Sequence, residues 1–217
     1  MANSSRDNIL AGIKTALSNF SDRLPEKPDM QSAIYNLEND KDPAIVFAEQ
    51  FMARKGVFFY SESLAEFRIQ IAEFVKRKDF RHIYVWENEL AEELQGSGFQ
   101  FSVHDRGLSQ IECGITLCEC LLTRTGSIVV SSKQMAGRRL TVYPPTHIVV
   151  ASTSQLVPDI KEGLAFMHKK YGQNLPSMIS VVSGASRTAD IEKTLVMGAH
   201  GPKELILFLI DDVDVKA

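Results

Sequence analysis

Two short stretches combine glycine, hydroxyl and cationic residues in a pattern suited to holding an anion. One reads Ser-Gly-Ala-Ser-Arg-Thr over 183–188, directly after an apolar run, and the other reads Thr-Arg-Thr-Gly-Ser over 123–127. Glycine permits a close backbone approach, and successive N–H groups in such a bend can face one concavity beside a guanidinium. We predict one anion-binding cleft, lined by Thr125, Gly126, Ser127, Arg138, Ser183, Gly184, Ser186 and Arg187.

Each stretch also has an ordinary structural interpretation. Ser186 or Thr188 could cap a helix that we predict over 187–197, where Asp190 and Glu192 would complement the helix dipole. The 125–127 stretch could be a simple turn with glycine at its positive-φ position. The residues alone leave both interpretations open.

Two residues are candidates for acid–base chemistry, and the sequence assigns a reaction to neither. Glu119 lies near the second stretch, where it could act as an acid or pair with Arg124 or Arg138. His147 begins a predicted strand, where a hydrogen-bonded structural histidine is more common than a general base. His200, in the helix-to-strand loop 198–204, is expected at the opposite edge of the sheet from Gly184.

Three cysteines, Cys113, Cys118 and Cys120, lie within eight residues. Zinc and iron–sulfur sites normally take four ligands from signatures that contain CxxC pairs, and this spacing is CxxxxCxC without a fourth cysteine. We therefore expect small packing residues, with no metal and no cofactor in this chain.

Composition excludes several classes of function. The formal net charge is −3 over 217 residues, whereas a nucleic-acid-binding domain is clearly basic. No run approaches the ~20 apolar residues of a membrane helix, and the first residues lack the apolar core of a signal peptide. We expect a cytoplasmic protein without nucleic acid or membrane insertion.

Alternation of helix and strand predicts a single α/β domain over 41–217, preceded by a helical arm and linker over 1–40. The arm holds an amphipathic helix at 5–20. We predict a mostly parallel sheet covered on both faces. The predicted helices are 42–53, 63–77, 87–98, 113–122, 154–172 and 187–197; the predicted strands are 56–60, 82–86, 99–103, 127–132, 147–152, 177–182 and 204–210, with 127–132 and 147–152 as possible antiparallel neighbours.

Several of these stretches, in this order, resemble the LUD domain, the family of lactate-utilisation protein C that is also known by the label YkgG. The resembling stretches are GIT at 114–116, TGS at 125–127, GRRLTVYPPTHIVV at 137–150, VPDI at 157–160 and SGASRTADIEKTLVMGAHGPKEL at 183–205. The resemblance implies a three-layer α/β/α fold similar to the group of ribose-5-phosphate isomerase, glucosamine-6-phosphate deaminase and CoA-transferase. One departure is Arg124, which stands where the family usually has glutamate.

The resemblance also implies a role in oxidising L-lactate to pyruvate with two partner proteins that carry iron–sulfur clusters, and a small anionic metabolite as ligand. A second hypothesis is a stand-alone enzyme on the same scaffold that acts on a phosphorylated or carboxylated metabolite. A third is an interaction module without a ligand.

Overall fold

The computed structural model describes residues 5–18, 41–191, 194–197 and 200–212. Two units divide the chain, Met1–Asn36 and Leu37–Ala217, and each is described by itself. The described part of the first is one helix, α1 (Ser5–Ser18), which leaves the apolar side chains of Ile9, Ile13 and Leu17 half or more exposed. Within the described residues, no helix is long and apolar enough to span a membrane.

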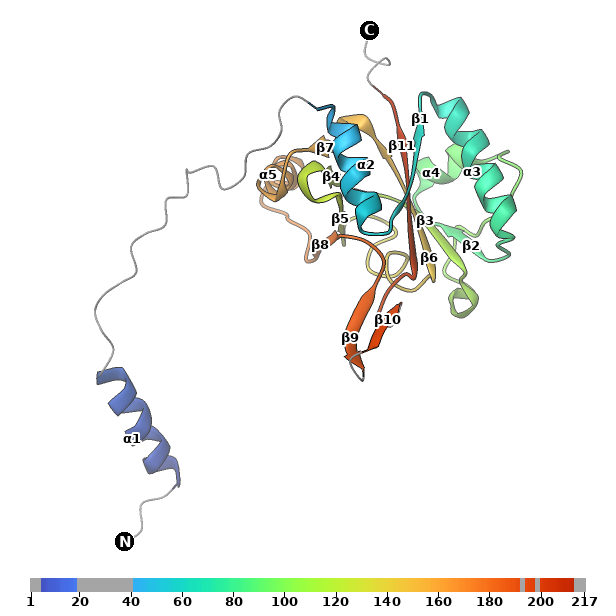
Figure 1. The fold of residues 1–217 in the computed structure, drawn as a ribbon. Helices are drawn as coiled ribbons and strands as arrows, with labels where there is room; N and C mark the ends of the chain where they lie inside the picture. The colour runs from blue at the N-terminus through green and yellow to red at the C-terminus, as the bar shows by residue number, and fades with distance from the viewer. Residues whose placement is uncertain (1–4, 19–40, 192–193, 198–199, 213–217) are drawn as a thin grey trace. The chain divides into compact units, whose positions relative to one another are not determined.

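The second unit is built on a parallel sheet that, within the described residues, has five strands in the order β1-β11-β6-β3-β2 (Figure 1). Both faces are covered. Alternate residues of β6 and β11 point to opposite sides: Ile148 and Phe208 pack with helices α3 and α4, and Val149 and Leu207 pack with helix α2. The bounds are β1 Val57–Ser61, β2 Ile83–Val85, β3 Cys113–Leu117, β6 Thr146–Ser152, β11 Glu204–Ile210, α2 Pro43–Ala53, α3 Leu64–Lys78 and α4 Asn88–Leu94.

A second sheet lies on the α2 side and has, among the described residues, the order β7-β4-β5-β8. Strand β5 runs antiparallel to both of its neighbours. Helix α5 packs on the outer face of this sheet through Phe166. The bounds are β4 Cys120–Leu122, β5 Ser127–Ser131, β7 Leu156–Val157, β8 Ile179–Val182 and α5 Ile160–Tyr171; short 3₁₀ turns span Leu108–Gln110, Thr123–Thr125 and Thr153–Gln155.

The predicted α/β class with a mostly parallel sheet is confirmed, and the helices predicted at 42–53 and 63–77 form with side-chain caps. Helix α2 has Pro43 at its first position, and the Asp42 side chain accepts the N–H of Ala44. At the start of α3, the Ser63 hydroxyl accepts the N–H of Glu66, and the Glu66 carboxylate accepts the N–H of Glu62.

Two predicted helices are strands, and both corrections change the candidate site. The segment 113–122 forms β3 and β4. Its side chains alternate with a period of two: Cys113 and Ile115 face one core, and Gly114 and Thr116 face the other way. The segment 187–197 forms the antiparallel hairpin of β9 (Arg187–Ile191) and β10 (Thr194–Met197). Its sequence is rich in β-branched residues, which favour strands.

Three smaller corrections follow. Residues 99–103 are not a strand: Ser102 makes one isolated bridge to Tyr84, while Phe99 and Phe101 pack against the core. Segments 127–132 and 147–152 are not neighbours, because β5 and β6 belong to different sheets. The helix predicted from 154 begins only at Ile160, where Asp159 caps α5, because a 3₁₀ turn and β7 occupy the residues before it.

Candidate anion-binding site

The two glycine-bearing bends meet at one end of the β5–β8 ladder. Strand β5 begins beside the end of β8, with Ile128 paired to Val182. The hydroxyls of Ser127 and Ser183 lie 2.7 Å apart. The predicted adjacency of the bends is confirmed, and it arises because β5 runs antiparallel to β8.

Both bends press against the C-terminal end of α2. A Cβ on Gly126 would lie 2.4 Å from the backbone nitrogen of Phe51, and a Cβ on Gly184, which has φ +123°, would lie 2.9 Å from the carbonyl oxygen of Arg54. The exposed Arg187 guanidinium donates to that same carbonyl at 2.6 Å. A cation at a helix C-terminus is favourable. Arg187 therefore stabilises the end of α2 in addition to any role in binding.

The remaining residues of the predicted cleft also lie at this end, except one. The buried hydroxyl of Thr125 has no hydrogen-bond partner among the described residues. Ser186 donates its N–H to the carbonyl oxygen of Pro202 at 2.8 Å. The hairpin therefore returns the loop 200–203 to the side of Gly184, and our placement of that loop at the opposite edge is wrong because no helix separates the two segments. Binding of an anion at this bend stays a prediction.

Arg138 lies at the other end of the same ladder. It donates to the hydroxyl of Ser177 at 2.8 Å, and Ser177 lies 3.1 Å from the hydroxyl of Ser132. Ser132 follows Ser127 by five positions along β5 and its end, which is about 17 Å at the rise of a β-strand. The structure therefore separates Arg138 from the other seven residues of the predicted cleft.

An open hollow of about 530 Å³ surrounds Arg138. Arg139 lies over the indole ring of Trp86, 5.0 Å from the ring centroid, and forms an ion pair with Asp105 at 3.3 Å. The sequence predicts Arg138 as a ligand-binding residue but does not single out Trp86, which lies in the predicted strand 82–86. The lining residues are Trp86, Ser132, Gln134, Met135, Ala136, Gly137, Arg138, Arg139 and Ser177.

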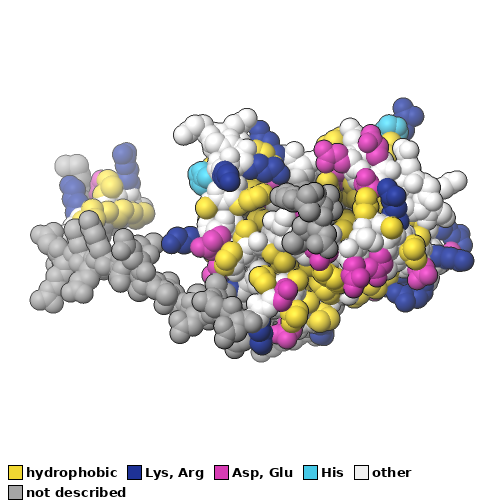
Figure 2. All heavy atoms as spheres, turned by 90° about the horizontal axis from the view of Figure 1, so that it is seen from above, with side chains coloured by type: hydrophobic (Ala, Val, Ile, Leu, Met, Phe, Trp, Pro, Cys, Tyr) yellow, Lys and Arg dark blue, Asp and Glu magenta, His cyan; other side chains and the backbone are white. Residues whose placement is uncertain are grey.

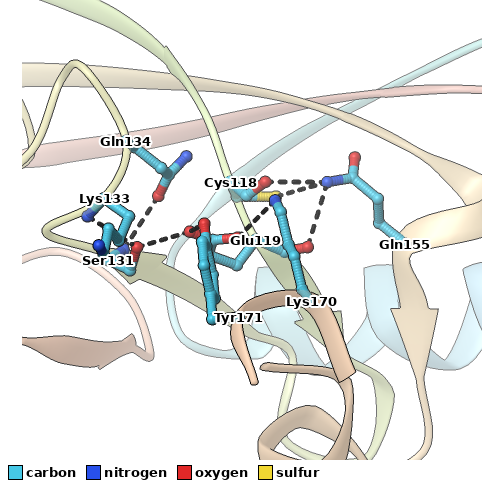
Figure 3. A network of polar contacts seen from close by, with 8 residues as sticks. All are labelled: Cys118, Glu119, Ser131, Lys133, Gln134, Gln155, Lys170 and Tyr171. Carbon is cyan, nitrogen blue, oxygen red and sulfur yellow. Dashed lines mark hydrogen bonds and ion pairs between the residues drawn. The ribbon is translucent and has the colours of Figure 1, made fainter. Parts of the chain in front are cut away.

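The candidate acid Glu119 is buried and bonded on both carboxylate oxygens (Figure 3). Oε1 accepts from the hydroxyls of Ser131 at 2.5 Å and Tyr171 at 2.8 Å, and Oε2 pairs with the Lys170 ammonium at 2.8 Å. Its partners are therefore not Arg124 or Arg138. The network ties the end of α5 to the second sheet, which is a structural role.

Arg124, which departs from the family pattern, forms a two-pronged ion pair with Asp159, with N–O distances of 2.7 and 2.9 Å. Hydrogen bonding from the Arg124 guanidinium lowers the pKa of Asp159. Because Asp159 also caps α5, Arg124 connects the 123–125 turn to the start of that helix.

The second candidate, His147, lies in the middle of the parallel sheet. Its Nε2 is 2.8 Å from the Thr116 hydroxyl, and its Nδ1 has no partner among the described residues. Burial lowers the pKa of His147 to about 4. The side chain is 1 % exposed, which suits a neutral core histidine and leaves no access for a substrate.

We predict that His147 and the buried Glu87 give stability opposite dependences on pH. The pKa of His147 is about 6.5 in the unfolded chain and about 4 in the native protein. Between these pH values only the unfolded chain binds the proton, so acid destabilises the fold through this group by roughly 3 kcal/mol. Burial raises the pKa of Glu87 to about 7, so native Glu87 keeps a proton between about pH 4.5 and 7 and acid stabilises the fold by a similar amount.

In the unmodified chain, the opposite effects of His147 and Glu87 on the free energy of unfolding should largely cancel as the pH changes. A variant that lacks one of the two groups should show the effect of the other. In Glu87→Gln, the free energy of unfolding should fall as the pH drops from 6.5 to 4; in His147→Gln it should rise between pH 7 and 4.5. Urea unfolding across this range measures both. Parallel slopes in the two variants would contradict the assignment.

The carboxyl edge of the parallel sheet is acidic. A hollow of about 380 Å³ there is lined by Ser152 and Gln155 together with Glu89, Glu92 and Glu93. Figure 2, which views the molecule from above, shows acidic and apolar side chains together on this face. Although ligands of open α/β sheets usually bind at this edge, its charge is unfavourable for an anion.

The three cysteines are buried and unpaired. Burial raises the pKa of all three thiols. Among the described residues, no group of three or more His, Cys, Asp or Glu side chains could hold a metal ion.

Comparison with known proteins places these motifs in a family. The LUD domain matches residues 24–210. The chain belongs to the LUD domain family. It is 34 % identical over 103 residues to lactate utilization protein C 1 of Bacillus mycoides, covering 46 % of this chain and 44 % of that one. It is 28 % identical over 184 residues to lactate utilization protein C of Halalkalibacterium halodurans, covering 84 % and 72 %.

The LUD chain also resembles an uncharacterized protein of Escherichia coli, YkgG, at 33 % identity over 105 residues, 48 % of this chain and 46 % of that one. It spans about half the length of most curated relatives that it matches. A crystal structure of a DUF162 family protein from Deinococcus radiodurans shares the fold, with a TM-score of 0.56 and 18 % identity over 78 % of this chain and 99 % of that chain.

Proposed function

We propose that this LUD protein is a component of a system that oxidises L-lactate to pyruvate, that it carries no redox centre, and that it binds a small organic anion. The observation that carries the proposal is the LUD match over residues 24–210, together with relatives named for lactate utilization. The homologous relationship supports a lactate-related role, and the division of labour within the system is our inference.

Oxidation of lactate to pyruvate removes two electrons and two protons, so the system needs an electron acceptor. We propose that iron–sulfur partner proteins supply it. Among the described residues, the three thiols are buried with raised pKa values, so none of them is an exposed, reactive thiolate.

The experiment is a deletion of this chain in its own cell, followed by growth on L-lactate as carbon source. We expect growth to fail, to return with the full chain, and iron–sulfur proteins to co-purify with a tagged copy. Unimpaired growth on lactate would contradict the proposal. Turnover of a phosphorylated or carboxylated metabolite by the purified chain alone would instead favour the stand-alone enzyme.

We place the anion at the Ser127–Ser183 end of the ladder, where Arg187 gives one of its five N–H donors to the Arg54 carbonyl and leaves the others unpaired within the described part of the chain. Arg187→Ala is expected to abolish stabilisation by lactate or pyruvate, which in the unmodified chain should reach about 2.7 kcal/mol at a hundredfold excess over Kd. Thermal unfolding with and without each acid measures this. The matched control is Arg77→Ala, which removes the same charge from α3; an unchanged ligand effect in Arg187→Ala would refute the site.

A further inference from the structure

We propose that the hollow around Arg138 is a second binding site, for a small organic molecule that carries a carboxylate or phosphate group. It lies at the opposite end of the β5–β8 ladder from the Ser127–Ser183 bend, and the inference does not rest on the proposed function.

Trp86 lines the hollow and is 8 % exposed, and its Nε1 has no hydrogen-bond partner among the described residues. An indole N–H can only donate. Leaving a buried donor unpaired is costly, so such a group in a native structure requires an explanation, and a bound molecule is one. The partner that would satisfy Trp86 is therefore an acceptor atom.

The other groups of the hollow are also mainly donors. Arg138 uses one nitrogen on Ser177 and has no carboxylate partner among the described residues. Gln134 accepts the N–H of Ser131 through its Oε1 at 3.0 Å, so its NH₂ group remains a donor, and Figure 3 shows that nitrogen turned away from Ser131. A set of donors around one opening suits the oxygens of an anion.

The balance of charge agrees. The two arginines bring two positive charges, and the Asp105 carboxylate at Arg139 offsets one of them. Glu87, next to Trp86 in sequence, accepts the N–H of Ala136 and could oppose an anion. Because burial raises its pKa to about 7, it carries only part of a negative charge at neutral pH.

Size and shape favour a molecule larger than a bare ion. About 530 Å³ lies within the range of small-molecule sites. The exposed Met135 side chain gives the hollow an apolar surface for the body of the ligand, while the Arg139 guanidinium lies over the Trp86 ring.

Trp86 is the one tryptophan of the sequence, so its fluorescence reports directly on this site. The full chain is titrated with inorganic phosphate, ribose 5-phosphate and pyruvate at constant ionic strength, with sodium chloride as the balancing salt. We expect a saturable change in Trp86 fluorescence with at least one probe. A response to the phosphates alone identifies a phosphate ligand, and a response to pyruvate alone identifies a carboxylate.

Arg138→Ala is expected to weaken that binding at least tenfold, since hydrogen bonds to charged groups are strong. Arg138→Lys should give an intermediate loss because lysine cannot bind with two prongs. Arg77→Ala and Arg187→Ala should leave the titration unchanged, which separates this site from the Ser127–Ser183 bend. Equal binding by Arg138→Ala and the unmodified chain, or no saturable response to any probe, would overturn the proposal.

Discussion

Gly126→Ala is expected to destabilise the second unit by at least about 3 kcal/mol. A left-handed conformation costs an alanine roughly 1 kcal/mol, and Gly126 has φ +55°. The larger cost is steric, because the new methyl would lie 2.4 Å from the Phe51 nitrogen and 2.5 Å from the Gln50 carbonyl carbon, both backbone atoms. Relief requires that α2 move away, which would unpack the buried Phe47 and Phe51 rings.

Urea unfolding followed by circular dichroism measures this loss. Gly96→Ala is the matched control, since Gly96 also has a positive φ, +80°, but an added Cβ would have nothing within 4 Å. It should cost only about 1 kcal/mol. Equal losses in the two variants would show that α2 does not hold the 125–127 bend as tightly as the structure indicates.

Glu119→Ala is expected to lower the free energy of unfolding by about 3 kcal/mol, a large share of the 5–15 kcal/mol typical of a domain. The change leaves the hydroxyl of the fully buried Ser131 and that of Tyr171 without an acceptor and removes the partner of Lys170. The Lys170 side chain is about half exposed and regains water, so most of the cost falls on the hydroxyls.

The control for this variant is Glu73→Ala on the exposed face of α3, which should change stability by no more than about 0.5 kcal/mol. Glu119→Gln keeps the shape and an acceptor for the hydroxyls but loses the ion pair, so it should lie between the two. If Glu119→Ala were as stable as Glu73→Ala, the network of Figure 3 would not contribute to the fold.

Local signals in the sequence predicted the elements that depend on local chemistry. Helices α2 and α3 carry their caps within four residues, and both begin where the cap predicts. Segment 113–122 was misassigned because leucine, cysteine and glutamate are compatible with either structure. The choice is made by pairing on both sides with β2 and β6, which are distant in sequence.

The candidate site shows the same division. The meeting of Ser127 and Ser183 followed from strand direction and was predictable, although the two residues are 56 positions apart. The packing of the end of α2, with its Arg54 carbonyl, against these two bends was not predictable, because that segment carries no motif of its own. Arg138 was grouped with the wrong residues because its loop reaches the far end of β8, which only coordinates reveal.

The position of β11 between β1 and β6 has a consequence for the nascent chain. On a ribosome, β1 emerges long before residues 204–210, which form the strand that joins β1 to the rest of the sheet in the described part of the chain. Until then, the apolar side chains of Phe58 and Phe59 lack their packing partners on β11, and α2, α3 or a chaperone must shield them from water. Completion of the domain is deferred until synthesis has passed Ile210.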